Sequence, residues 1–212
     1  GAPASVEIST PPTVTVQAGT AYTGVIQAIV YDKGHNTVAN SPTTQVKFSS
    51  PLINDRSISG IPSVTFNDTN LTSTVYTTTV AGGLGVATVS VPVIGTCALG
   101  NFQVTATLVG VTANPSALNM SIVRGDPKQF SVLTGDNQHS RIKSQFATNL
   151  ATTLQDGCGN FLPGQQVSFS TATTTTQPGG NFNSEGSGVV SVTVTTDANG
   201  LATAPALFAN TV

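Results

Sequence analysis

Apolar and polar residues alternate with a period of two along most of this chain, which is the pattern of half-buried β-strands. No segment keeps the 3.6-residue spacing of an amphipathic helix over three turns. Turn-forming pairs such as Pro11-Pro12, Gly82-Gly83 and Asn114-Pro115 separate the alternating segments. Short strands between frequent turns predict an all-β fold, with antiparallel sheets packed as a β-sandwich.

The alternation also predicts where the strands lie and which side chains face the core. In the first part of the chain we expect strands at 5–10, 13–17, 25–32, 45–50, 63–67, 73–80, 86–93, 102–109 and 117–123. In the second part we expect strands at 129–133, 146–155, 166–170, 188–195 and 201–207. The side chains expected to face the core of the first part are Val46, Phe48, Phe102, Val104, Ala106, Leu118, Met120 and Ile122.

The second part of the chain repeats the first part about 120 residues later. The matching segments are 32–36 with 156–160, Gln45–Ser49 with Gln166–Ser170, and 85–88 with 200–203. A chain of this length has room for two domains of about 100 residues, each able to bury a core. We therefore predict two tandem domains, 1–124 and 125–212, with the join at Arg124-Gly-Asp-Pro127.

The second copy of the repeat ends early. The first copy continues for about 40 residues after Gly85, through two further strands, whereas 12 residues follow Gly200. Without those strands, the strand at 166–170 loses a neighbour and part of the inner face meets water. Exposing several hundred Å2 of apolar surface costs on the order of 10 kcal/mol, as much as a whole domain's stability.

Three arrangements remain open for this incomplete domain. A longer natural chain, continuing downstream, completes it. Another copy or a neighbouring subunit inserts strands into the open sheet by β-strand addition, a head-to-tail contact that builds filaments when it does not close. The third arrangement is a smaller variant of the sandwich.

The motifs Asp156-Gly-Cys-Gly-Asn160 and Asp197-Ala-Asn-Gly-Leu-Ala-Thr203, with the segment 131–138, resemble the bacterial immunoglobulin-like repeats of the invasin/intimin type. The resemblance covers nearly all of the second domain and, more loosely, the first. It implies two immunoglobulin-like antiparallel β-sandwiches, the second lacking its last two strands within this chain. It also implies an extracellular surface protein, because members of that family form the stalks and recognition tips of adhesins, fibres and cell-wall proteins.

The composition argues against some classes of function and favours others. Only 8% of residues are charged and the net charge is −2, so there is no electrostatic argument for nucleic acid or an anionic membrane. No run approaches the roughly 20 apolar residues of a membrane helix. The chain begins with no charged-then-apolar leader, so we expect any signal peptide to be removed or to lie upstream. A surface poor in charge suits an extracellular protein that packs against copies of itself.

The two cysteines, Cys97 and Cys158, permit one disulfide. Cys97 lies in the loop between the fifth and sixth sandwich strands of the first domain, and Cys158 in the loop between the second and third strands of the second domain. In sandwiches these loops lie at the poles that face the join, so an interdomain disulfide is one interpretation. Two unrelated thiols, or a bond between chains, are the alternatives. Neither cysteine has a nearby histidine that would activate a thiolate.

The remaining candidates are weaker. The pairs Asp32/Asn36, Asp156/Asn160 and Asp197/Asn199 offer oxygens to calcium, but Asx residues are common in turns and the ligands are fewer than calcium requires. His35 and His139 are isolated, and no zinc spacing, phosphate loop or nucleophile elbow occurs, so we predict no catalytic or metal site and no cofactor. Glycosylation sequons occur at Asn67, Asn70 and Asn119, with Asn119 expected to point outward.

Two functions follow from these observations. The first is a non-enzymatic extracellular module of a surface fibre, filament or stalk, assembled through domain–domain or strand-addition contacts with copies of itself or adjacent repeats. The alternative is an adhesin module whose loops recognise a host protein or glycan. The absence of Trp and the presence of only three Tyr weaken the second, since recognition sites favour those residues.

Overall fold

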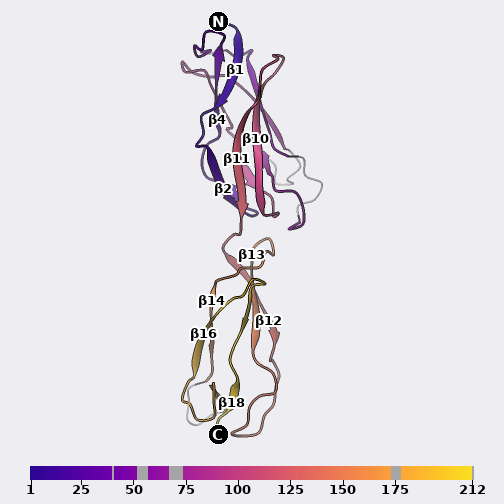
Figure 1. Cartoon of the computed structure of the whole chain (residues 1–212), viewed down its shortest axis with the longest axis vertical. Coiled ribbons are helices and arrows are strands. Elements are labelled where there is room, and N and C mark those ends of the chain that lie inside the picture. The colour runs from indigo at the N-terminus through magenta and orange to yellow at the C-terminus, as the bar shows by residue number, and fades with distance from the viewer. Residues whose placement is uncertain (40, 52–56, 67–73, 173–177, 212) are drawn as a thin grey trace. The chain divides into compact units, whose positions relative to one another are not determined.

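The computed structural model describes residues 1–39, 41–51, 57–66, 74–172 and 178–211. The chain divides into two compact units, Gly1–Gly125 and Asp126–Val212. All regular secondary structure in the described residues is β-strand, as Figure 1 shows. The all-β prediction is therefore confirmed, and each unit is described by itself below.

The described residues of unit 1 form three sheets. The first is a three-stranded sheet in the order β1 (Pro3–Ile8), β4 (Gln27–Asp32) and β8 (Val86–Thr88). The second has the order β2 (Thr13–Gln17), β11 (Ser116–Val123), β10 (Gly100–Leu108), β5 (Gln45–Ser49) and β7 (Val75–Thr79). The third is a short sheet of β3 (Ala21–Tyr22), β9 (Val93–Gly95) and β6 (Val64–Phe66). All pairings are antiparallel except β2 with β11, which is parallel.

Alternating side chains of the five-stranded sheet form much of the core of unit 1. Figure 1 shows the long strands β10 and β11 side by side, and their register pairs Val104 with Leu118. The predicted inward positions Val46, Phe48, Val104, Ala106, Leu118, Met120 and Ile122 are buried, and Phe102 is half-buried. The period-two pattern therefore assigned the core face of this sheet correctly.

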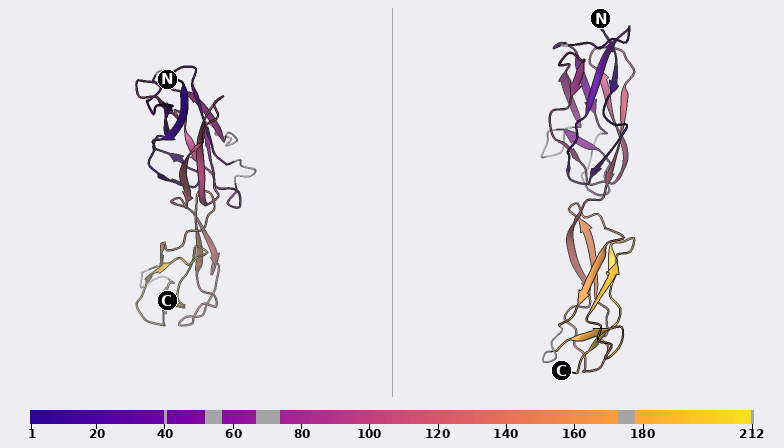
Figure 2. Two further views of the ribbon diagram at one scale, coloured as in Figure 1. Left: turned by 45° about the horizontal axis from the view of Figure 1, so that its top comes forward. Right: turned by 90° about the vertical axis from the view of Figure 1, so that its left-hand side faces the viewer.

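Unit 2 repeats most of the strand pairings of unit 1. Figure 2 shows the strands of both units in two further views. The strands β12 (Pro127–Thr134), β13 (Ala151–Asp156) and β17 (Leu201–Thr203) pair as β1, β4 and β8 do. The strands β14 (Gln166–Ser170) and β16 (Ser191–Thr195) pair as β5 and β7 do. The strands β15 (Gly180–Phe182) and β18 (Leu207–Ala209) pair as β6 and β9 do.

Two glycines of the repeat hold the same position in both units. Gly85 and Gly200 adopt positive φ angles of 68° and 66°. Their carbonyls accept the backbone N–H of Val30 and Leu154 at 3.0 and 2.9 Å. A Cβ on Gly200 would lie 2.6 Å from the carbonyl oxygen of Leu154, so only glycine fits without displacement of the backbone.

Several predicted strand limits are wrong, and proline explains two of them. The predicted strand 86–93 is divided into β8 and β9, and 201–207 into β17 and β18. Pro92 and Pro205 lie in these segments, and proline has no N–H to donate to a ladder. The predicted strand 146–155 begins only at Ala151, and the short strands β3 and β15 were not predicted. The predicted strands 63–67 and 73–80 extend into 67–73, outside the described residues.

The described part of unit 2 contains no counterpart of β2, β10 or β11. The prediction that the second sandwich lacks its last two strands within this chain is therefore confirmed. No counterpart of β2 was predicted, since the expected strands of unit 2 include none between 133 and 146, and its absence has a simple cause. In unit 1, β2 is held by its parallel pairing with β11, and the described residues of unit 2 offer no such partner.

Candidate functional site: an open strand edge in unit 2

The same repeated strand has two neighbours in unit 1 and one in unit 2. In unit 1, β5 lies between β10 and β7. In unit 2, the corresponding strand β14 pairs with β16 alone among the described residues. One edge of β14 therefore carries backbone donors and acceptors that no described strand satisfies, and such an edge is a template for another strand.

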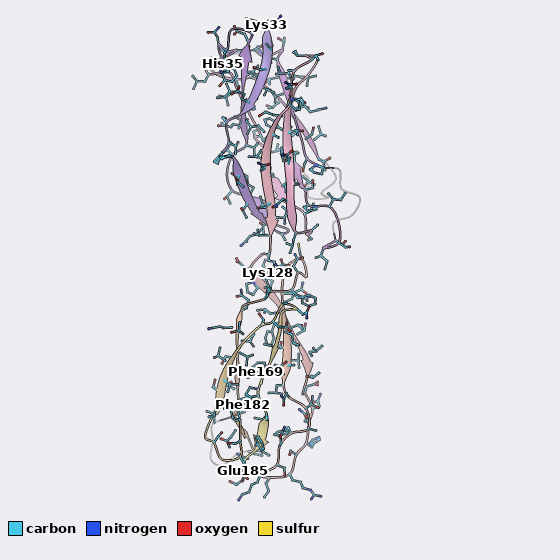
Figure 3. All side chains as sticks on the ribbon, viewed as in Figure 1. Lys33, His35, Lys128, Phe169, Phe182 and Glu185 are labelled. Carbon is cyan, nitrogen blue, oxygen red and sulfur yellow. The ribbon has the colours of Figure 1, made fainter. Side chains whose placement is uncertain are left out.

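The inner face around this edge is partly uncovered. Phe48 on β5 is fully buried, whereas Phe169, at the corresponding place on β14, is half-buried. Figure 3 labels Phe169 on β14 and Phe182 on β15; Phe182 is fully buried. The core of unit 2 is thus closed around β15 but incomplete along β14.

The first strand of each unit shows the same contrast more strongly. Pro3 pairs with Asp32 and Val6 with Val30 in unit 1, while Pro127 pairs with Asp156 and Phe130 with Leu154 in unit 2. Val6 and Phe130 therefore hold equivalent positions. Val6 is 3% exposed and Phe130 is 59% exposed. Val132, two residues further along the same face, is 63% exposed.

The cause lies in the strands that face β1. In unit 1, β1 lies against both β10 and β11. The backbone N–H of Ile8 donates to Ser116 Oγ at 2.9 Å, which ties β1 to the start of β11. Because the described residues of unit 2 contain no equivalent of these two strands, its first strand, β12, is exposed at every position.

The Asp residues considered for calcium instead cap turns. Asp156 Oδ1 accepts the backbone N–H groups of Cys158 and Asn160, both at 2.9 Å, and Asp156 is fully buried. Asp32 repeats this geometry in unit 1 and Asp197 repeats it before β17. Each carboxylate therefore organises a tight turn. The described residues contain no group of three or more His, Cys, Asp and Glu placed to hold a metal ion.

The Asp32 carboxyl has a perturbed pKa. Hydrogen bonding from the backbone N–H of Asn36, followed by the contact with the N-terminal amine, lowers the pKa of Asp32 to about 2. These donors stabilise the charged form of the carboxylate. His35, in the same turn, stacks on Tyr31 with 4.3 Å between ring centroids, so it packs as part of the turn.

The two cysteines are both oxidised, and neither has a free thiol. Cys97 follows β9 and precedes Gly100, which pairs with Ile122 near the end of unit 1. Cys158 follows β13, whose last residue Asp156 pairs with Pro127 near the start of unit 2. Each cysteine therefore lies at the end of its own unit where the chain passes to the other unit.

The predicted glycosylation sites fall in different places. Asn67 and Asn70 lie outside the described residues. Asn119 lies exposed on β11, as predicted, and its Oδ1 accepts a hydrogen bond from Gln103 Nε2 at 2.9 Å. Its use as a glycosylation site stays a prediction.

Comparisons with known proteins find distant structural neighbours and no relative by sequence. No family model and no curated protein sequence matches the chain. Among solved structures, it is similar to the Escherichia coli adhesin FdeC, with 15% identity, a TM-score of 0.46, and coverage of 98% of this chain and 55% of that one. It is also similar to the Yersinia pseudotuberculosis adhesin InvE, with 14% identity, a TM-score of 0.35, and coverage of 96% and 50%.

A third similar structure is domains 5–6 of the surface-layer protein SbsC, with 15% identity, a TM-score of 0.33, and coverage of 99% of each chain. At such identities the likeness concerns the fold alone. The chain spans about half the length of the two adhesin structures.

The open edge is the feature that the sequence predicted best. The early end of the repeat predicted that the strand at 166–170 would lose a neighbour, and the pairing of β14 confirms this. The exposure of Phe130 and Val132 was not predicted. A signal was present, because these apolar residues occupy the positions of Val6 and Ile8 when the two Asp turns are aligned.

No helix in the described residues is long and apolar enough to cross a membrane.

Proposed function

We propose that this chain is a non-enzymatic extracellular structural module of a surface fibre, filament or stalk. The observation that carries the proposal is the open edge of β14 together with the exposed apolar face of β12. A sandwich with both features gains stability by accepting strands, and strand addition joins protein segments through backbone hydrogen bonds. The turns capped by Asp and the chain's low charge suit a packed, repetitive assembly.

The test is to locate the protein on the cells that produce it. Immunogold electron microscopy with antibodies against unit 1 should label extended structures on the cell surface. Labelling confined to the cytoplasm, or recovery of the protein only as a freely secreted monomer, would overturn the proposal.

Cys97 and Cys158 form one intrachain bridge in this proposal. Their positions at the joined ends of the two units support this pairing, and no catalytic group accompanies either residue. In the chain-entropy model a loop of about 60 residues contributes roughly 4 kcal/mol. Peptide mapping under non-reducing conditions should recover Cys97 and Cys158 in one linked peptide pair from the monomer band, whereas a disulfide-linked dimer contradicts the intrachain bridge.

An adhesin role is the second candidate, and a groove in unit 2 favours it. This groove has a volume of about 370 Å3 and combines polar side chains with an aromatic ring. Its lining includes Gln138, His139, Ser140, Phe146 and Asn210. Polar groups around an aromatic surface suit a glycan. Binding to a glycan array that is lost in Phe146→Ser would support this role, and an array without signal would remove it.

A further inference from the structure

The two cysteines enclose a well-defined set of strands. Cys97 lies between β9 and β10, and Cys158 follows β13. The structure describes every residue between them, 98–157, and this segment contains β10 and β11 of unit 1 and β12 and β13 of unit 2. β10 pairs antiparallel with β11, and β12 pairs antiparallel with β13. The segment therefore contains both members of two strand pairs, with the join between the units in its middle.

Cys97 is attached to a firmly held part of unit 1. Its neighbours Thr96 and Ala98 are both buried. The backbone N–H of Thr96 donates to the carbonyl of Ser63 at 3.0 Å, and Thr96 Oγ1 accepts the backbone N–H of Ser63 at 3.2 Å. Ser63 leads directly into β6. A pull on Cys97 is therefore passed to the interior of unit 1 through these hydrogen bonds as well as along the backbone.

Cys158 is attached to a firmly held turn of unit 2. Its backbone N–H donates to Asp156 Oδ1 at 2.9 Å, and Asp156 is fully buried. The buried Asn160 donates from Nδ2 to Asp156 Oδ2 at 3.0 Å, and its carbonyl accepts the backbone N–H of Asp156 at 3.0 Å. Each cysteine is itself half-buried, so neither residue is closed off from solvent. Both cysteines thus combine a rigid attachment with access for a small reagent.

We propose that a Cys97–Cys158 bridge acts as a redox-controlled bypass for tension. The inference rests on the intrachain bridge of the proposed function and gives that bridge a mechanical role. Tension between the two ends of the chain follows the shortest covalent path, which passes from Cys97 through the two sulfur atoms to Cys158. Residues 98–157 lie off this path. Their backbone, including the join between the units, carries no tension while the bridge is intact.

Breaking the bridge changes which strands carry the tension. Tension then leaves unit 1 through the end of β11 and enters unit 2 through the start of β12. β11 is held by β10 on one side and by the parallel strand β2 on the other, so these pairings then resist the pull. The released segment of about 60 residues adds roughly 200 Å of length when it is fully extended. A fibre of such modules therefore lengthens under load only after reduction.

The reductant is a small-molecule thiol. Its thiolate attacks one sulfur of the bridge, the S–S bond breaks, and a mixed disulfide forms with one cysteine. A second thiol attacks the mixed disulfide, and the products are two cysteine thiols and the disulfide of the donor. Two electrons and two protons pass from the donor to the chain, so the step is balanced without a further reactant.

Force–extension measurement on single molecules of the 212-residue chain, held by tags at both ends, tests the bypass. At a force that unfolds both units, the oxidised chain should remain roughly 200 Å shorter than the reduced chain. Adding dithiothreitol under constant force should release this length. The double variant Cys97→Ser/Cys158→Ser should extend fully with or without dithiothreitol. Equal lengths for the oxidised and reduced native chains would overturn the proposal.

A matched pair of insertions tests which residues lie off the path. A flexible insert of about 20 residues after Gly110 lies within the bypassed segment, and the same insert after Gly83 lies on the path. Both glycines are in exposed turns, which tolerate insertions. In the oxidised chain the insert at Gly83 should add about 70 Å and the insert at Gly110 should add nothing, whereas after reduction each should add about 70 Å. Lengthening of the oxidised chain by the Gly110 insert would contradict the bypass.

The failure of this inference is distinguishable from the failure of the proposed function. A covalent dimer on a non-reducing gel would place the bond between chains and overturn the bypass, while surface labelling would still support a structural module of a fibre or stalk. A thiol-dependent extension without surface labelling would support the bypass and overturn the proposed location.

Discussion

The equivalent positions Val6 and Phe130 show that a strand's own sequence does not decide whether its face is buried. Both residues form the second register pair after an irregularity near the start of their strand, in sheets with the same strand order. The larger and more apolar Phe130 is the exposed one. Burial was decided by β10 and β11, which lie on a different sheet and far away in the sequence. The alternation of side chains along a strand indicates which face is apolar, and the packing of the opposite sheet determines whether that face is buried.

The largest expected effect comes from placing a charge at these two positions. Val6→Asp introduces an unpaired carboxylate into a closed core and should lower the stability of unit 1 by about 3–5 kcal/mol. Phe130→Asp faces solvent and should cost less than about 1 kcal/mol in the free chain. All three tyrosines lie in unit 1, so denaturant unfolding followed by tyrosine fluorescence measures that unit alone.

Amide exchange in β12 and β13 gives the matching measurement for Phe130→Asp. A loss of protection in unit 2 as large as the loss in unit 1 would mean that the two faces are equally buried in solution. The comparison between the units would then be incorrect.

Proline at the repeated strand gives the next largest difference. Lys47→Pro removes an N–H that faces β10 inside a five-stranded sheet and should cost on the order of 3 kcal/mol. Ser168→Pro removes the equivalent N–H at an open edge and should cost less than about 1 kcal/mol. Thermal unfolding monitored by tyrosine fluorescence for Lys47→Pro, and by circular dichroism for both variants, measures the contrast. Equal destabilisation would show that the β14 edge is already paired.

Substituting the repeated glycines should destabilise both units to a similar extent, because Gly85 and Gly200 hold the same conformation. Gly85→Ala and Gly200→Ala each force a side chain into a left-handed conformation beside a backbone carbonyl. Each should cost at least about 1–2 kcal/mol in its own unit. Chemical denaturation with unit-specific readouts tests this expectation. A neutral Gly200→Ala variant would indicate that unit 2 lacks the tight turn at β17.

The smallest effect is a pH dependence in unit 1. The pKa of Asp32 is lowered to about 2 in the folded chain, first by the backbone N–H of Asn36. A depressed carboxyl pKa contributes stability above the unfolded-state pKa and loses it as the pH falls from about 4 toward 2. Asp32→Asn should therefore flatten the acid side of the stability profile. Tyrosine-monitored unfolding between pH 5 and 2 measures it, and parallel profiles for both chains would contradict the expectation.

Much of the fold and of the candidate site was predictable from local patterns. Period-two alternation identified the core positions Val46 and Phe48, and the repeated Asp turns were recognisable because carboxylates cap turns through nearby amides. The early end of the repeat predicted the missing neighbour of β14. The short strands β3 and β15 were not predictable, since two or three residues carry no periodic signal. The list of expected strands contained no counterpart of β2 in unit 2, but the physical reason came from the structure, where β2 of unit 1 pairs with β11, a partner about 100 residues away.

The sequence by itself determined that this protein is built from two repeats of alternating strands and capped turns, because strand alternation, glycine conformation and Asx turns are local properties. Only the tertiary structure decided which apolar faces are covered and where short strands such as β3 and β15 form. Burial and the formation of short strands depend on segments that come into contact only in the folded chain, and the sequence of a single strand does not specify which segment packs against it. For this chain the functional hypothesis rests on both kinds of information, because the early end of the repeat predicted the open edge of β14 and the tertiary structure revealed the uncovered face of β12.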